Sequence, residues 1–408
     1  MNILLLNAGS SSLKATVMES TDGSVVARGL ADWAGSVTRY EYAGSRGKDC
    51  SEEVSWKGHG KAVDHFVFDV MHKTPVVLPD RSALAAVGHR VVHGGPFAAS
   101  VRITPEIRSR ITGLADLAPL HNPPSLETLA AAEAELADVP HVAVFDTAFH
   151  STISPEARTY PVPGSWTRDW GIRRFGFHGL SHAYCARRAA EMLGGPADQL
   201  RLVICHLGHG CSASAVRGGQ CIDTTMGFTP LEGLMMATRC GSIDPSIVLH
   251  VQQHHGLTAE QVEAALNRES GLLGVSGVSG DMRQVLDAAR EGHEQARLAL
   301  GIYAHRARQA IGALVVTLGG IDALVFTAGV GENASKIRED ICAGLECLRL
   351  ELDSQANDRC RPDADIARRG ARARILVIAT REDVSMLREI NQVLAEKTSS
   401  DYRQGVGR

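Results

Sequence analysis

The sequence predicts an α/β fold built from two similar halves, and three observations lead to this class. Short apolar strands alternate along the chain with helical patterns, which is typical of α/β proteins. A strand–turn–strand block near the N-terminus recurs with an offset of 199 residues, so that Gly9 corresponds to Gly208 and Val17 to Val216. At roughly 150 residues per domain, a chain of 408 residues contains two or three domains.

The first half is expected to begin with a hairpin whose polar turn contains glycine and several serines. Its strands are predicted at residues 3–6, 13–18, 87–92 and 141–145. Residues 33–61 are polar and are predicted to form a hairpin insertion. Apolar residues at helical spacing then predict helices over residues 125–137 and 181–193.

The second half repeats the hairpin and ends in a helix. Its strands are predicted at residues 202–205, 212–216, 323–327 and 374–379. Helices are expected over residues 259–267, 296–318 and 382–395. Residues 397–408 read as a frayed polar tail.

Charge and composition exclude several classes of protein. The 42 Lys and Arg against 46 Asp and Glu give a net charge of −4, whereas a nucleic-acid binder would carry a basic surplus. No apolar run approaches the roughly 18 residues of a membrane-spanning helix, and the N-terminus does not resemble a signal peptide. The nine cysteines contain no C-x-x-C pair, so we expect reduced thiols in a cytoplasmic protein.

Glycine-rich turns follow three of the predicted strands, at residues 9–12, 208–210 and 329–331. Such turns expose backbone N–H groups that bind anions, and three of them at strand ends favour a phosphate ligand. Neither G-x-x-x-x-G-K-S/T nor G-x-G-x-x-G occurs, which argues against a P-loop ATPase and a Rossmann dehydrogenase.

Polar side chains also stand at strand ends, where α/β proteins bind ligands. Asn7, Arg90 with His93, and Asp146 are candidates of this kind. His178 and His182 have the i, i+4 spacing of a zinc pair, but the sequence offers no evident third ligand.

Eight blocks, in the right order along nearly the whole chain, resemble the acetokinase family, the acetate kinases. These are short-chain acyl kinases of the sugar kinase, chaperone and actin superfamily. The resemblance rests on residues 7–14, 88–95, 118–123, 145–150, 175–182, 226–233, 279–283 and 326–333.

The resemblance implies two actin-like (ribonuclease H-like) domains, each a mixed sheet flanked by helices, with the active site in the cleft between them. The N-terminal domain is expected at residues 1–150 and is joined by the C-terminal helix at 384–400. The nucleotide-binding domain is expected at 151–383. The implied reaction is reversible, Mg²⁺-dependent transfer of a phosphoryl group from ATP to acetate, giving acetyl phosphate and ADP. Mn²⁺ is expected to substitute for Mg²⁺, and the protein is expected to be a cytoplasmic homodimer.

Residue roles carried over from the family start with the reacting groups. Asn7 and Glu382 match the metal positions, and oxygen ligands suit a hard cation such as Mg²⁺. The four matching catalytic residues are Arg90, Asp146, His178 and Arg239. Guanidinium groups hold carboxylate and phosphoryl oxygens bidentately, as phosphoryl transfer requires. Because a carboxylate substrate is already ionised at pH 7, Asp146 is either an acid/base or an orienting group.

The family also implies which residues contact the nucleotide and the acyl group. The expected nucleotide contacts are Lys14, His206, Leu207, Gly208, His209, Gly210, Asp281, Met282, Arg283, Gly329, Val330, Gly331, Glu332 and Asn333. The expected acyl pocket is made by Arg90 with the apolar residues Val92, Leu120, Phe177 and Pro230. Val92 narrows that pocket in favour of acetate.

Three positions depart from the family pattern. His209 stands where the phosphate turn usually has Asn, Ser242 where Asp is common, and Arg381 where Asn usually precedes Glu382. These departures leave ATP and pyrophosphate open as the phosphate donor. Propionate or butyrate kinase, and a non-catalytic actin-like ATP-binding or filament module, remain as alternative functions.

Overall fold

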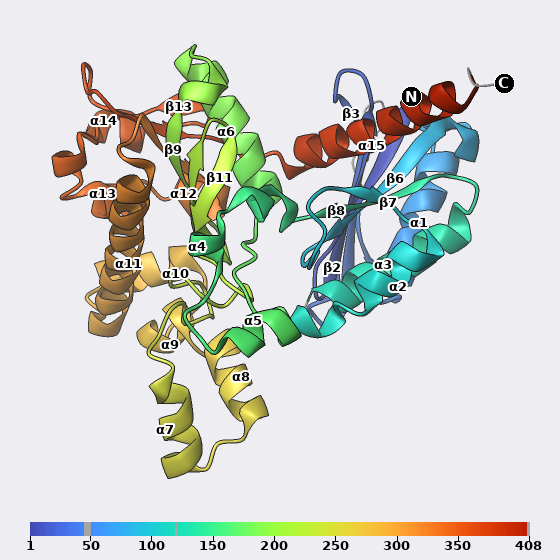
Figure 1. Cartoon of the computed structure of the whole chain (residues 1–408). Helices are drawn as coiled ribbons and strands as arrows, with labels where there is room; N and C mark the ends of the chain where they lie inside the picture. The colour runs from blue at the N-terminus through green and yellow to red at the C-terminus, as the bar shows by residue number, and fades with distance from the viewer. Residues whose placement is uncertain (45–49, 119–120, 406–408) are drawn as a thin grey trace. The chain divides into compact units, whose positions relative to one another are not determined.

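The computed structural model describes residues 1–44, 50–118 and 121–405, which form two compact units. The first unit contains Met1–Ala148 together with Arg381–Arg408, and the second contains Phe149–Thr380. Figure 1 shows that α15 (Glu382–Gly405), drawn in red, lies with the blue strands of the first unit although it ends the chain. Thus both ends of the chain belong to the first unit.

The described residues of the first unit form an eight-stranded mixed sheet in the order β5-β4-β3-β2-β1-β6-β8-β7. Strands β1, β6 and β8 run parallel to one another, and the remaining pairs are antiparallel. The strands are β1 (Asn2–Ala8), β2 (Ser12–Glu19), β3 (Val25–Asp32), β4 (Thr38–Gly44), β5 (Cys50–Val54), β6 (Leu84–Val91), β7 (Val101–Arg102) and β8 (His141–Phe145). The unit's other helices are α1 (His59–His72), α2 (Pro105–Thr112) and α3 (Asn122–Glu135).

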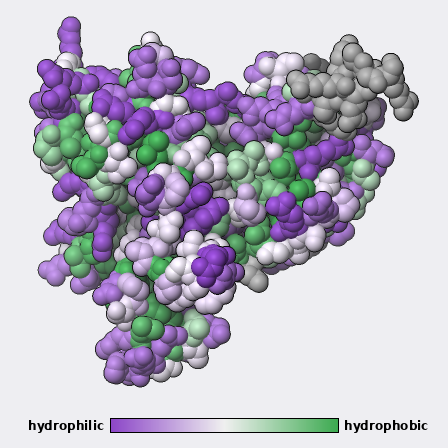
Figure 2. Space-filling view, in the orientation of Figure 1, coloured by the Kyte–Doolittle hydropathy of each residue, from purple (hydrophilic) through white to green (hydrophobic). Residues whose placement is uncertain are grey.

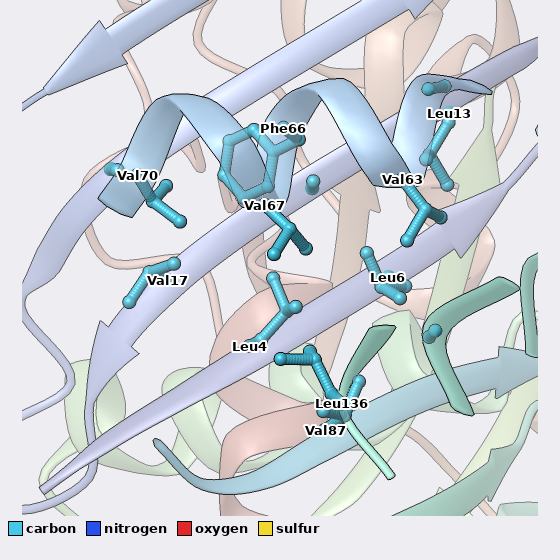
Figure 3. Close-up of a cluster of buried hydrophobic side chains, with 14 of the residues drawn as sticks. Leu4, Leu6, Leu13, Val17, Val63, Phe66, Val67, Val70, Val87 and Leu136 are labelled. Carbon is cyan, nitrogen blue, oxygen red and sulfur yellow. The ribbon is translucent and has the colours of Figure 1, made fainter. Parts of the chain in front are cut away.

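Alternating side chains of β1 separate the two faces of this sheet. Leu4 and Leu6 point into an apolar core with Val63 and Phe66 of α1, as Figure 3 shows. The opposite face is covered by α15. Gly88 of β6 lies so close to this helix that a Cβ there would come within 2.2 Å of Ile390. A side chain at position 88 would therefore require the Ile390 side chain to move.

The described residues of the second unit form a six-stranded sheet in the order β11-β10-β9-β12-β14-β13. The strands are β9 (Arg201–Leu207), β10 (Cys211–Arg217), β11 (Gln220–Thr224), β12 (Ala323–Thr327), β13 (Ala364–Asp365) and β14 (Arg374–Val377). The helices are α4 (Pro155–Arg158), α5 (Gly164–Trp170), α6 (Gly179–Leu193), α7 (Ser246–His255), α8 (Ala259–Arg268), α9 (Gly271–Ser276), α10 (Met282–Arg290), α11 (Glu294–Leu318), α12 (Ala328–Asn333), α13 (Ser335–Cys342) and α14 (Ser354–Asp358).

Helices α6 and α11 cover opposite faces of the β9–β10 hairpin. Cys185 and Ala189 of α6 share a buried core with Ile204 and Val216. On the other face, Cys211 contacts Tyr303 of α11, with 3.2 Å between the sulfur and the phenol oxygen. Side chains of β10 therefore point alternately to α6 and to α11.

The predicted repeat of two hairpins is confirmed. In each unit an antiparallel hairpin, β1–β2 or β9–β10, places its first strand parallel to the next central strand, β6 or β12. The strands predicted at 141–145 and 323–327 are confirmed at both ends. The α/β class is confirmed, with two mixed sheets flanked by helices.

Three expectations about local structure need correction. The hairpin predicted within residues 33–61 is present as the antiparallel pair β4–β5, but it is not an insertion, because these strands extend the main sheet at its edge. Helix α1 begins at His59, inside the supposed insertion. The strand expected to continue to residue 379 ends at Val377, and the tail expected to fray is helical through Gly405.

The surface mixes polar and apolar residues. Figure 2 shows the two kinds interspersed over the visible face. Within the part of the chain that the structure describes, no helix combines the length and the apolar character needed to cross a bilayer.

Candidate active site

Four of the predicted site residues lie together in the first unit, three at the ends of parallel strands and one at the start of α15. Asn7 lies near the end of β1, Arg90 near the end of β6, and Asp146 directly after β8, so all three stand at one sheet edge. Glu382, the first residue of α15, approaches from the helix that covers this face. We refer to Asn7, Arg90, Asp146 and Glu382 as the Arg90 cluster.

Hydrogen bonds from the Arg90 guanidinium hold this cluster together. Nε and Nη2 donate to Oδ1 and Oδ2 of Asp146 over 3.1 and 2.7 Å. Nη1 donates to Oε2 of Glu382 over 2.9 Å and to Oδ1 of Asn7 over 3.4 Å. Arg90 therefore makes a bidentate pair with one carboxylate and a single bond with the other, a geometry that lysine cannot reproduce.

Burial makes these charged contacts strong. The side chain of Asp146 is 1% exposed, that of Arg90 15% and that of Glu382 19%. Burial by itself disfavours the charge on Arg90, but the facing carboxylates of Asp146 and Glu382 outweigh it and raise the pKa of the guanidinium. The cluster thus holds one permanent cation among two carboxylates and an amide oxygen.

This donor set also fits a hard divalent cation. Asn7, Asp146 and Glu382 direct four side-chain oxygens at one group, Arg90. Mg²⁺ takes oxygen ligands, keeps several waters and needs only one or two carboxylates from the protein. Lys14 is the cross-strand neighbour of Asn7, so its exposed side chain lies on the same face of the sheet.

In the second unit, His178 lies in a tight set of polar contacts at the start of α6. Its φ of 58° places it in the left-handed region. Its ring stacks on His206 of β9 with centroids 4.1 Å apart and an angle of 16°. Its Nδ1 lies 2.9 Å from Oγ of Ser212 on β10. These contacts fix the plane of the imidazole.

Arg239 joins His178 beside the turn between β9 and β10. A Cβ at Gly210 would lie 3.3 Å from Cε1 and Nε2 of His178, and 3.6 Å from Nη1 of Arg239. Arg239 donates from Nη1 to the carbonyl oxygen of Pro230 over 3.0 Å. Burial lowers the pKa of its guanidinium. An anion beside Gly210 would therefore meet an imidazole and a largely desolvated guanidinium.

A pocket of about 1130 Å³ opens near the same turn of the second unit. This is large enough for a nucleotide. Eight predicted nucleotide contacts line it, namely Gly208, His209, Asp281, Met282, Arg283, Gly329, Val330 and Asn333. Burial, together with the nearby charge of Arg239, lowers the pKa of His209, so this imidazole presents no full charge to the pocket at pH 7.

A comparison with known protein families decides how the chain is classified. The model of the acetokinase family matches residues 2–388. The chain belongs to the acetokinase family. It is therefore a phosphotransferase, with ATP or ADP as co-substrate.

Individual relatives within this family cover almost the whole chain. This chain is 44% identical over 409 residues to an acetate kinase of Cyanothece sp. The aligned region covers 98% of this chain and 100% of the relative. The crystal structure of Porphyromonas gingivalis acetate kinase has a TM-score of 0.89 at 36% identity and covers 96% of this chain and 99% of its own. A propionate kinase from Francisella tularensis has a TM-score of 0.88 at 35% identity, and the match covers 95% of this chain and 98% of the propionate kinase.

Besides Lys14, which belongs to the first unit, five residues expected to contact the nucleotide do not line the pocket. They are His206, Leu207, Gly210, Gly331 and Glu332. Leu207 is fully buried, and His206 bonds through Nδ1 to Oγ of Ser181 over 2.8 Å. Oε1 of Glu332 accepts from the backbone N–H groups of Ala328 and Thr380, over 2.9 and 3.0 Å. Glu332 therefore ties the start of α12 to the chain after β14.

The pocket also has walls that family motifs did not point to. Leu286 and Arg290 follow Met282 at intervals of four residues along α10, and Lys336 lies on α13. The i, i+4, i+8 spacing places Met282, Leu286 and Arg290 on one face of α10, and this spacing is visible in the sequence. Asp281 acts as the N-cap of α10, accepting from the backbone N–H of Arg283 over 2.9 Å.

The predicted acyl pocket stays a prediction. Val92 belongs to the first unit, whereas the buried Phe177 and the half-buried Pro230 belong to the second. Leu120 lies outside the described residues. The zinc alternative for His178 and His182 gains no support, because both rings bond to Ser212 and the described residues contain no metal-binding group of three or more His, Cys, Asp or Glu.

Two of the three departures from the family pattern have a local structural account. Arg381 forms a bidentate pair with Asp383 over 2.8 and 3.0 Å, and its charge is thereby balanced beside Glu382. Ser242 exchanges hydrogen bonds with Gly233, whose backbone N–H it binds through Oγ over 3.1 Å. His209 is the departure that faces the pocket itself.

Proposed function

We propose that this protein transfers a phosphoryl group reversibly between ATP and acetate, giving ADP and acetyl phosphate. The observation that carries the proposal is the family match over residues 2–388, together with near-complete coverage by relatives named acetate kinase. The Arg90 cluster and the large pocket of the second unit are consistent with this reaction. The proposed chemistry draws on residues from both units, and the interdomain cleft implied by the family stays a prediction.

The reaction is an in-line displacement at the γ-phosphorus of ATP. A carboxylate oxygen of acetate forms the new P–O bond while the bond to the β,γ-bridging oxygen breaks, and ADP leaves with the electron pair. Carboxylates have a pKa near 4, so the nucleophile is ionised at pH 7 and needs no base. Catalysis then depends on positioning and on charge stabilisation of the transferred group.

Arg90, Arg239 and His178 supply that stabilisation in this proposal. Arg90 is held rigidly by two carboxylates, so its orientation is set before substrate binds. Arg239 is partly buried, and its reduced contact with water strengthens its attraction for phosphoryl oxygens. The ring of His178 faces Gly210. Because Gly210 has no side chain, an anion can approach the His178 ring from this side.

Asp146 is proposed to orient Arg90 and not to transfer a proton. Both of its oxygens accept hydrogen bonds from the guanidinium, and its side chain is 1% exposed. A carboxylate engaged in this way has little free capacity to act as a base. The structure therefore favours the orienting role among the two that the sequence left open.

Asn7 and Glu382 are proposed to hold a Mg²⁺ ion, for which Mn²⁺ can substitute. When bound, the metal neutralises charge on the β- and γ-phosphoryl oxygens. The oxygen donors of the Arg90 cluster fit this ion, as described above. Lys14 is proposed to contact ATP from the same sheet face, and the pocket of the second unit is proposed to hold adenosine and its phosphates. A cytoplasmic homodimer remains our expectation for the assembly.

A propionate kinase is the second candidate, because the Francisella enzyme has almost the same TM-score as the acetate kinase structure. One methylene is worth only about 1–3 kcal/mol in an apolar pocket. We therefore expect propionate to react, but more weakly than acetate.

A steady-state assay that traps acetyl phosphate as a hydroxamate tests the proposal. It compares ATP with pyrophosphate as donor and acetate with propionate as acceptor. Acyl phosphate formed from ATP and acetate with the highest kcat/KM is the expected result. A protein that binds ATP but forms no acyl phosphate with either acid would be a non-catalytic actin-like module, and the proposal would be wrong.

A further inference from the structure

A buried serine links two histidines behind the proposed phosphoryl site. Oγ of Ser212 lies 2.9 Å from Nδ1 of His178 and 2.8 Å from Nε2 of His182. Ser212 and His182 are both fully buried. Ser212 reaches α6 because alternate residues of β10 face that helix, as Val216 also does.

The hydroxyl of Ser212 has a single proton, so it donates to one ring and accepts from the other. The assignment follows from His182. Its Nδ1 is buried and has no hydrogen-bond partner. A proton there would be an orphaned buried N–H, which is rarer and costlier than an unpaired acceptor. The proton of neutral His182 therefore lies on Nε2, and Nε2–H donates to Ser212.

The surroundings of His182 keep its ring neutral. Burial, followed by the neighbouring rings of His150 and His206, lowers the pKa of His182 well below its usual range. A neutral His182 that donates to Ser212 leaves the serine O–H free to donate in turn. Its acceptor is Nδ1 of His178.

His178 must then carry its own proton on Nε2. That nitrogen lies on the side of Gly210, where a Cβ would be 3.3 Å from it and 3.6 Å from Nη1 of Arg239. Groups close to the ring include His206 of β9, stacked at 4.1 Å, Ser212 of β10, His182 of α6 behind Ser212, and the cationic Arg239. The positive charge of Arg239 opposes a second proton on His178.

We propose that His182 and Ser212 are positioning residues that hold His178 as the neutral Nε2–H tautomer, so that it donates a hydrogen bond to the phosphoryl group and does not accept a proton. The identity of that anion rests on the proposed function. The tautomer itself rests only on the contacts within the second unit. Its measurement therefore gives an answer whether or not acetyl phosphate is the product.

The test is nitrogen NMR on full-length protein labelled with ¹⁵N-histidine. The His178 signals are assigned by their loss in His178→Gln. We expect an unprotonated Nδ1 and a protonated Nε2 for His178 at pH 7 in the wild type. In Ser212→Ala we expect His178 to populate both neutral tautomers. The value of kcat should fall roughly tenfold, as for one lost hydrogen bond, while KM for ATP changes less than about twofold.

Ser214→Ala is the matched control for this change. Ser214 is also fully buried on β10, but its Oγ bonds to Oγ1 of Thr224 over 2.8 Å and not to a histidine. Ser214→Ala should leave the His178 tautomer and kcat unchanged. Circular dichroism melting of both variants shows whether each is folded.

Two substitutions of His182 provide a second, independent test. The side-chain NH₂ of Gln can replace Nε2–H, so His182→Gln should keep the His178 tautomer and most of kcat. His182→Met removes the donor and should mix the tautomers as Ser212→Ala does. A proton on Nδ1 of His178 in the wild type, or an unchanged tautomer in both Ser212→Ala and His182→Met, would overturn the proposal.

Discussion

Replacing Asp146 by Asn would test whether this carboxylate orients Arg90. The wild-type carboxylate accepts from Nε and Nη2 of Arg90 over 3.1 and 2.7 Å. An amide at position 146 offers one oxygen, and its NH₂ group then faces the second guanidinium N–H as donor against donor. The substitution keeps the size of the side chain but removes one of two charged hydrogen bonds.

The expected cost follows from these contacts. A hydrogen bond between charged groups contributes about 1.5–3 kcal/mol. Removing all partners of a buried ion would cost about 3–5 kcal/mol, but Glu382 remains 2.9 Å from Arg90 and limits the loss. We therefore expect Asp146→Asn to lower the free energy of unfolding by about 2–3 kcal/mol. kcat should fall as well, because Arg90 loses its fixed orientation.

Urea unfolding followed by circular dichroism measures the first quantity, and the hydroxamate assay across pH measures the second. Asp64→Asn is the control, since Asp64 is 43% exposed and pairs with Lys61 at 3.6 Å. Such surface pairs contribute little, so we expect a change below about 0.5 kcal/mol. A variant with near wild-type kcat, stability and pH dependence would refute both an orienting and an acid/base role. A lost limb in the pH profile would instead favour acid/base chemistry.

Three further outcomes are expected. Burial lowers the pKa of His150 to about 4, so the folded state binds fewer protons than the unfolded state between about pH 4 and 6.5. This group therefore destabilises the protein by about 3 kcal/mol as the pH is lowered from 6.5 to 4, and stability rises again as the pH is raised. Urea titrations of His150→Gln should give a shallower dependence of stability on pH, by up to one proton. His209→Asn should lower KM for ATP by roughly two- to tenfold in steady-state assays, since an amide can donate to phosphate from the pocket wall, and an unchanged KM would contradict this reasoning. Val92→Ala should lower KM for propionate by roughly tenfold relative to acetate, and no improvement would mean that Val92 does not set chain length.

The sequence predicted the centre of the first unit well because local and global signals agree there. Strand β8 is buried along its whole length, and its apolar run predicts both ends. Asn7, Arg90 and Asp146 were expected together because parallel strands end at one edge, and their hydrogen bonds confirm this placement. Glu382 joins them from 292 residues away in the chain, a contact that only the family resemblance indicated.

The segment at residues 33–61 was predicted only in part, although the signals for the rest are present in the sequence. Along β4, the buried Thr38, Tyr40 and Tyr42 alternate with exposed charged residues, which is the pattern of a half-buried strand. Helix α1 buries residues at helical spacing from His59 onward, but its first three residues lie within the segment predicted as a hairpin insertion. The high overall polarity of residues 33–61 outweighed both periodic patterns.

No sequence pattern predicts the two hydrogen bonds that Ser212 makes with His178 and His182. They bring together residues from β10 and from two positions on or beside α6, and they depend on which face of β10 the serine occupies. Likewise, the role of Glu332 in tying α12 to the chain after β14 depends on backbone N–H groups, which any residue can supply. The family resemblance implies a nucleotide contact for Glu332 because residues 329–333 match a stretch around adenosine and its phosphates.

The position of α15 has a consequence for how the protein is made on the ribosome. The second unit lies entirely between Phe149 and Thr380, so its strands are all synthesised before α15 emerges. The first unit is translated first but must wait for Ile390 to cover Gly88 and for Glu382 to complete the contacts of Arg90. At about 5–20 residues per second this delay is on the order of tens of seconds. The nascent first unit therefore lacks the cover of α15 on this face of its sheet throughout that interval.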